Sequence, residues 1–232
     1  MLTLGCAGPN WSAGVGLRAP EHAVAEALGE TDRPPERFDP TSLPAIDQPD
    51  HTRPCCGFGM DLGIGVGSAQ VYTIPNIKSV EELGKHAYDN GTLTFDSDLQ
   101  RFARMEGDGL VYTCRGGFID TAHVRDYADL TVFVAMRLAA ALPGPAVLTL
   151  PGDGAVRRLR LASLPSMTEA DRWEWAVRLA EYAVFQLSVF HELASWYGRR
   201  TTPSWSEKAS AFSPEDLYSN LLGIRIAGGI VR

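Results

Sequence analysis

The sequence predicts a single α+β domain in which two long helices pack beside a small antiparallel sheet, with several short helices around them. A chain of 232 residues fits one domain with some irregular sequence to spare. Hydrophobic residues make up 45% of the chain and charged residues 21%, which leaves enough apolar side chains for a sizeable core. Two long apolar segments with helix-start signals, near residues 120–142 and 166–198, flank two short strand-like runs. These observations together indicate the α+β class.

The chain divides into three predicted parts. Residues 1–6 resemble the end of a bacterial lipoprotein signal, in which Cys6 would receive lipid, although the basic and apolar regions of such a signal do not precede it. Residues 7–53 are rich in Pro, Gly and charge and are expected to form a flexible linker. Residues 54–232 are the predicted globular domain. An unmodified cysteine in a disordered tail is the alternative interpretation of Cys6.

The first half of the predicted domain contains short elements. Residues 69–74 alternate as a strand, and the glycines at 57–67 precede it. A nucleotide-binding loop needs the reverse order, strand and then glycines, so this class of site is not expected. The capping-box sequence Ser79-Val80-Glu81-Glu82 predicts a short helix over 79–88, and residues 109–114 form a further strand pattern.

The second half contains the long helices. Asp120 is a natural N-cap for a helix that reaches Leu142, where a Pro-Gly pair stops it. Strands at 146–150 and 155–161 read as a hairpin. A second capping-box sequence at 166–169 predicts a helix that closes at Gly198. A last helix, with Pro214 at its first position, is expected to run from Ser213 to Gly223.

Charge excludes two classes of partner. The formal net charge of -7 and the absence of a Lys/Arg stripe argue against nucleic-acid binding and against attraction to anionic membranes. The most apolar stretch, residues 175–197, includes Arg178, Glu181 and His191 among its polar groups, which is too many for a lipid-facing helix. Membrane attachment is therefore expected only through an N-terminal lipid anchor.

Two histidines lie beside carboxylates on the long helices. His123 falls three residues after Asp120 and three before Asp126, in the apolar stripe of its helix. His191 is followed by Glu192, which starts like the zinc-protease signature His-Glu-x-x-His. Ser195 stands where that signature requires its second histidine, so a standard zinc protease is excluded.

These residues predict a site for a divalent metal, with zinc as the first candidate. We expect His123, His191 and Asp120 as ligands, Asp126 as an orienting carboxylate and Glu192 as the general base. The two histidines would meet if the long helices run antiparallel, because the first turn of one then faces the last turn of the other. Glu215 is an alternative base in the same interpretation.

Two other interpretations stay open. Each histidine fits a hydrogen-bonded core residue equally well, and Asp120, Glu215 and Asp216 fit helix caps. A cysteine hydrolase is the rival chemistry, with the nucleophile among Cys55, Cys56 and Cys114 and with His123 or His86 as the base. In an oxidising compartment a disulfide between Cys114 and either Cys55 or Cys56 is the more natural use of these thiols.

Four motifs resemble one bacterial family. They are Cys55-Cys56-Gly57-Phe58-Gly59, the run from Gly116 to Asp126, the run from His191 to Gly198, and the run from Ser210 to Gly223. Together they resemble the family catalogued as domain of unknown function four-zero-five-six, from about Arg53 to the C-terminus. The resemblance implies an exported or lipid-anchored bacterial protein and carries no established activity or ligand residues.

We therefore expect a periplasm-facing hydrolase of the cell envelope that uses a metal and acts on an envelope small molecule or polymer. The alternative is a non-catalytic envelope lipoprotein that binds a ligand or partner. The sequence predicts no oligomeric state.

Overall fold

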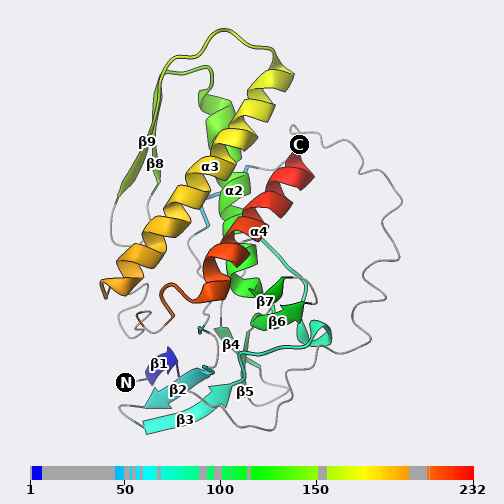
Figure 1. Ribbon diagram of the computed structural model, residues 1–232, viewed down its shortest axis with the longest axis vertical. Coiled ribbons are helices and arrows are strands. Elements are labelled where there is room, and N and C mark those ends of the chain that lie inside the picture. The colour runs from blue at the N-terminus through cyan, green and yellow to red at the C-terminus, as the bar shows by residue number, and fades with distance from the viewer. Residues whose placement is uncertain are drawn as a thin grey trace.

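The structure, a computed structural model, is an α+β body in which helices pack together beside small antiparallel sheets, as the sequence predicts (Figure 1). It describes residues 2–6, 45–49, 53, 56–57, 60–66, 69–88, 93–96, 101–104, 106–113, 116–150, 156–198, 208 and 210–232. Three long helices form its centre: α2 (Thr121–Ala141), α3 (Glu169–Trp196) and α4 (Pro214–Val231).

The three helices run in alternating directions. Helices α2 and α4 rise together in Figure 1, and α3 runs the opposite way. The first turns of α2 and α4 and the last turns of α3 therefore lie at one end of the helix group. This is the antiparallel arrangement of the two predicted helices, with a third helix beside them.

Local capping explains where two of the helices begin. The Oδ1 atom of Asp120 accepts hydrogen bonds from the backbone N–H groups of Ala122 (2.8 Å) and His123 (3.3 Å), so Asp120 is the N-cap that the sequence predicts. The N-cap of helix α3 lies two residues after the predicted one, at Thr168 and not at residue 166, and the Thr168 hydroxyl oxygen accepts from the Asp171 N–H (3.1 Å).

Helix α4 continues to Val231, so the predicted end at Gly223 is wrong. A Cβ atom added at Gly223 would lie 2.1 Å from the carbonyl oxygen of Val124 on α2. The glycine therefore permits a close approach of two helices and does not end one.

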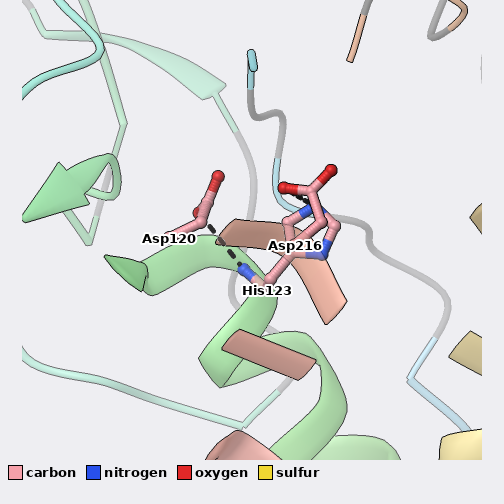
Figure 2. A group of neighbouring side chains, drawn as sticks. All are labelled: Asp120, His123 and Asp216. Carbon is pink, nitrogen blue, oxygen red and sulfur yellow. Dashed lines mark hydrogen bonds and ion pairs between the residues drawn. The ribbon is translucent and has the colours of Figure 1, made fainter. Parts of the chain in front are cut away.

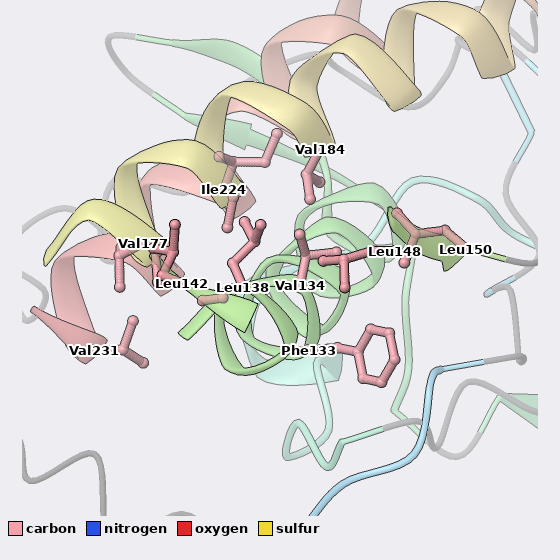
Figure 3. Close-up of a cluster of buried hydrophobic side chains, with 13 residues drawn as sticks. Phe133, Val134, Leu138, Leu142, Leu148, Leu150, Val177, Val184, Ile224 and Val231 are labelled. Carbon is pink, nitrogen blue, oxygen red and sulfur yellow. The ribbon is translucent and has the colours of Figure 1, made fainter. Parts of the chain in front are cut away.

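The hydrophobic core lies between the three helices and the hairpin that packs against them (Figure 3). Leu138 of α2, Val184 of α3 and Ile224 of α4 are almost completely buried and meet in this cluster. Leu148 and Leu150 close it from the hairpin side. Burial of these side chains supplies the main driving force for packing the helices.

The strands in the described residues form four small sheets. The first contains β1 (Leu2–Cys6), β2 (Leu62–Val66) and β3 (Ala69–Ile74), in that order and antiparallel. The other three are antiparallel pairs, and they are β4 (Leu93–Asp96) with β5 (Arg101–Arg104), β6 (Leu110–Thr113) with β7 (Gly117–Asp120), and β8 (Ala146–Leu150) with β9 (Arg157–Leu161). The β8–β9 pair is the predicted hairpin, and β7 leads directly into α2.

The predicted helix over 79–88 is reduced to a single 3-10 turn, η2 (Val80–Glu82). The predicted capping box does form, with the Ser79 N–H donating to the Glu82 carboxylate (2.8 Å). Beyond it the backbone bonds to a distant segment, because Gly84 N–H donates to the Glu106 carbonyl (2.7 Å) and Ala87 N–H to the Glu106 carboxylate (2.7 Å). These tertiary hydrogen bonds replace the helical ones.

The cysteine predictions lie largely outside the described residues. Cys56 is buried, whereas Cys55 and Cys114 are not described, so the disulfide stays a prediction. Cys6 ends β1 and lies opposite Leu62 of β2. In the described parts of the chain, none of the helices combines the length and apolar character needed to cross a bilayer.

Candidate metal centre

Three side chains meet at the shared end of α2 and α4 (Figure 2). Asp120 caps α2, His123 lies in its first turn, and Asp216 lies in the first turn of α4. One ligand atom of each lies within 4.8 Å of the others, and His123 Nε2 is 3.8 Å from Asp216 Oδ1. All three are buried, with exposed fractions of 0% for Asp120, 8% for His123 and 2% for Asp216.

The His123 ring is held in place from two sides. Its Nδ1 lies 2.6 Å from Oδ1 of Asn220, so the ring donates a hydrogen bond through Nδ1, and its Nε2 lies 3.8 Å from Asp216 Oδ1. The Tyr127 ring stacks against it with centroids 6.2 Å apart and an interplanar angle of 28°. A hydrogen-bond acceptor on the far nitrogen is the usual way in which a metal-binding histidine is oriented.

Unsatisfied polar atoms gather around this group. Among the described residues, Asp120 Oδ2, Glu192 Oε1 and Asn220 Nδ2 are buried and have no hydrogen-bond partner. Buried polar atoms in native proteins nearly always have a partner, and the two carboxylate oxygens of this set, Asp120 Oδ2 and Glu192 Oε1, are of the type that binds a cation, whereas Asn220 Nδ2 only donates. Asp120 shows the pattern most clearly, because one oxygen caps α2 while the other has no partner.

The charges around Asp216 also favour a bound cation. Burial raises the pKa of Asp216 well above its ordinary value, and the carboxylates of Asp120, Glu192 and Glu215 raise it further, while His123 opposes them. Three carboxylates and one imidazole of the described residues thus act on the Asp216 carboxyl group. A divalent cation bound there would favour the ionised form of Asp216.

The ligand types fit a transition metal. Catalytic zinc accepts three mixed nitrogen and oxygen ligands and keeps a fourth position for water. Bonds of about 2.0–2.1 Å at a tetrahedral angle place two ligand atoms roughly 3.4 Å apart. The 3.8 Å separation between His123 and Asp216 is slightly wider, so a small closure would complete the site.

The predicted residues are only partly brought together. Asp120 and His123 meet as expected, but the third member of the group is Asp216 and not His191. His191 is half-buried on α3 and, among the described residues, does not join the group. Its neighbour Glu192 is buried, accepts a hydrogen bond from the Phe212 N–H (3.0 Å), and exerts its charge on Asp216.

Asp126 belongs to a separate buried ion cluster. Its oxygens accept from the Arg53 guanidinium (2.6 Å) and from the Arg53 backbone N–H (3.0 Å). Arg53 also contacts Glu106 (2.5 Å) and Asp129 (3.2 Å) and is almost completely buried. Burial alone would lower the pKa of Arg53, but these carboxylates more than offset it and raise the pKa. Asp126 is therefore the ion partner of Arg53.

His86 lies in the same ion cluster. Its Nε2 is 2.9 Å from Asp129 and its Nδ1 is 3.2 Å from Glu106. The hydrogen bond to Asp129 raises the pKa of His86, burial and Arg53 oppose this, and Glu106 adds to the rise. His86 therefore has partners that explain its position without a nucleophilic cysteine.

Sequence reasoning missed Asp216 and Asn220 as site residues. Asp216 looks like an ordinary first-turn acid of a helix, which is a sufficient local explanation. The signal that was available is spacing, because Asp216, Asn220 and Gly223 recur at i, i+4 and i+7 and share one helix face. A face with two polar residues and a glycine is suited to close contact with another helix around a polar site.

A cleft opens beside the group, with a volume of about 670 Å³. The start of α4 forms one wall through Ser213, Glu215 and Tyr218, and the β6–β7 hairpin contributes Phe118. Glu215 joins the cleft to the metal group, since it lines the cleft and its charge acts on Asp216.

Comparison with known proteins identifies a family. No curated protein and no solved structure matches the chain. A family model described as Protein of unknown function (DUF4056) matches residues 43–232, which include the metal group, the cleft and Arg53. The chain belongs to this family.

Proposed function

We propose that the protein is a metal-dependent hydrolase whose metal ligands are Asp120, His123 and Asp216. The observation that carries the proposal is the free second oxygen of Asp120, buried beside His123 and Asp216 in a group whose ligand atoms lie within 4.8 Å. A divalent metal bound there supplies a Lewis acid that lowers the pKa of water and polarises a carbonyl group.

The residues of the chain have distinct roles in this proposal. Asp120 caps α2 with one oxygen and binds the metal with the other, which fixes the ligand to a rigid helix end. Asn220 holds His123 in the tautomer that presents Nε2. Glu192 accepts the proton from the attacking water, because one of its oxygens is anchored by the Phe212 N–H while the other has no partner.

The cleft beside α4 supplies the route for substrate. Glu215 lines it and is the alternative base, with its carboxylate 2.5 Å from the Ser213 hydroxyl. The proposed location is the bacterial cell envelope, with attachment through lipid on Cys6, and it rests on the sequence pattern around that residue. An envelope small molecule or polymer is the proposed substrate, and nucleic acid is not a proposed partner.

A metal-bearing, non-catalytic envelope protein is the second candidate. The observation that favours it is the near-complete burial of the three ligands, which is typical of closed structural metal sites. A structural metal would raise stability without supporting hydrolysis.

The test is hydrolysis of chromogenic ester and anilide substrates by the full chain, stripped of metal and then reloaded with Zn²⁺ or Mn²⁺. We expect activity only after reloading. Glu192→Gln should retain the metal and lose about 10²–10⁴-fold in kcat, the usual contribution of a general base. Glu174→Gln, an exposed carboxylate on the same helix, is the matched control and should change nothing. Metal binding without hydrolysis by the unaltered chain would favour the structural role.

A further inference from the structure

We propose that the cleft beside α4 binds a neutral oligosaccharide, whose sugar rings stack on aromatic side chains that line it. The inference rests on the proposed function, because it names the class of molecule that enters the same site: a sugar chain, whose ester or amide substituents are the bonds that the proposed hydrolase would cleave. The binding claim itself requires no metal.

Aromatic rings line part of the cleft. Phe118, Phe212 and Tyr218 line it, and the last two are 42% and 46% exposed. Two further exposed rings extend this surface, because Tyr112 packs edge-on against Phe118 (centroids 5.2 Å apart) and Trp196 against Phe212 (6.3 Å). The cleft is thus lined by rings from β7, from the segment before α4 and from α4, and rings of β6 and α3 pack against two of them. A contiguous exposed apolar patch of this kind marks a binding surface.

The backbone of Phe212 is strained. Its φ angle is 58°, in the left-handed region that a bulky side chain rarely adopts. The conformation is held by the hydrogen bond from the Phe212 N–H to the buried carboxylate of Glu192 (3.0 Å). Folding gains little from a ring left partly in water, so the strain indicates a role in binding. The same bond links the ring to the proposed general base.

The polar groups of the cleft select the kind of ligand. Among the described residues that line it, none is Lys, Arg or His, and Glu215 adds negative charge beside the acidic metal group. Anionic ligands are therefore repelled. The Tyr218 hydroxyl lines the cleft and is suited to a ligand with many hydroxyl groups, whereas the Ser213 hydroxyl donates to the Glu215 carboxylate (2.5 Å). A sugar ring fits both the aromatic rings and the polar groups of the cleft, because it has an apolar face for stacking and hydroxyl groups around its edge.

Size separates a sugar chain from a small cation. A cation could also contact these rings. However, a volume of about 670 Å³ lies in the middle of the range for pockets that hold ligands of several rings, and a small ammonium ion would leave most of it unfilled.

The test is calorimetric titration of the full chain, with metal removed by chelation, against chitotetraose, cellotetraose and maltotetraose. Choline and an oligogalacturonate are the cationic and anionic comparisons. We expect at least one neutral tetrasaccharide to bind, and choline and the oligogalacturonate to bind much more weakly. Phe212→Gly should weaken binding about tenfold, the upper range for loss of one aromatic contact.

We expect Phe212→Gly to fold normally, because glycine adopts the left-handed backbone conformation without strain. Tyr182→Ala removes an exposed ring on α3 that does not line the cleft and should leave the affinity unchanged. The inference is overturned if no neutral tetrasaccharide binds, if choline binds most tightly, or if Phe212→Gly binds as the unaltered chain does. Oligosaccharide binding by a chain that never hydrolyses the chromogenic substrates would refute the proposed function and leave this inference standing.

Discussion

Replacing Gly223 by alanine should separate two helices and disrupt the metal group together. Gly223 faces α2, and a Cβ atom there would lie 2.1 Å from the Val124 carbonyl oxygen and 2.8 Å from its carbonyl carbon. A carbon–oxygen contact normally needs about 3.3 Å, so α4 must move by roughly 1.2 Å at this point. Val124 follows His123 directly, and Asp216 and Asn220 lie on the same α4 face as Gly223. The displacement therefore acts on the ligand geometry.

The size of the effect follows from two opposing contributions. Overpacking of a close helix contact costs about 1–3 kcal/mol. Removing glycine from a helix interior returns about 0.5–1 kcal/mol. The net loss lies between about 0 and 2.5 kcal/mol, and its central value of about 1 kcal/mol corresponds to a fall in Tm of roughly 2–4 °C for a domain of this size. Displacement of Asp216 and Asn220 should weaken metal binding about 10–100-fold.

Thermal unfolding and Zn²⁺ titration of Gly223→Ala measure both effects. Gly229→Ala is the matched control, since it lies in the same helix and no atom lies within 4 Å of its added Cβ. The control should gain about 0.5–1 kcal/mol and bind metal normally. If Gly223→Ala retained full stability and metal affinity, the close contact would not position the site.

Three further changes test the packing and the ion cluster. Arg53→Met leaves the carboxylates of the buried cluster without their cation and should lower the free energy of unfolding in urea by about 3–5 kcal/mol. A loss of unfolding free energy below about 1 kcal/mol would show that the cluster is dispensable. Leu138→Ala removes a fully buried core side chain and should cost about 2–5 kcal/mol by the same measurement, whereas a near-neutral change would contradict its place in the core. The pKa of His86 is raised in the folded protein, so protonation of His86 stabilises the fold. This stabilisation is fully present below the unfolded pKa of about 6.5 and is lost as the pH rises through the folded pKa. The Tm difference between the unaltered chain and His86→Gln should therefore be larger at about pH 5.5 than at about pH 9, and a difference independent of pH would exclude the pairing with Asp129.

Local signals made the helix starts predictable. Asp120 caps α2 through backbone groups only two and three residues away, so the sequence contains the whole interaction. The same proximity placed His123 beside Asp120. Asp216 could not be found in this way, because its approach to His123 depends on the contact between α2 and α4. That contact depends on Gly223, which read as a helix end.

The rotation of α3 about its own axis explains why His191 lies outside the metal group. Helix α3 does run antiparallel to α2, and its last turns reach the predicted end (Figure 1). Successive residues point about 100° apart around a helix. Glu192 faces the interior, and His191 is only half-buried. Periodicity alone could not fix this rotation, because apolar residues occur on most faces of the segment.

The ion cluster had no sequence signal at all. Arg53, His86, Glu106, Asp126 and Asp129 come from four separate segments of the chain. Only the fold brings them together, and a buried arginine at the end of a predicted linker follows no local pattern.

The most direct test of the metal centre is calorimetric titration of Zn²⁺ into the metal-stripped full chain and its Asp216→Asn variant. Asparagine keeps the shape of the side chain and removes its negative charge, so the fold should be preserved. We expect one ion per unaltered chain, and an affinity at least tenfold weaker in the variant. Failure of the unaltered chain to bind Zn²⁺ or Mn²⁺, or equal binding by Asp216→Asn, would contradict a metal centre formed by Asp120, His123 and Asp216.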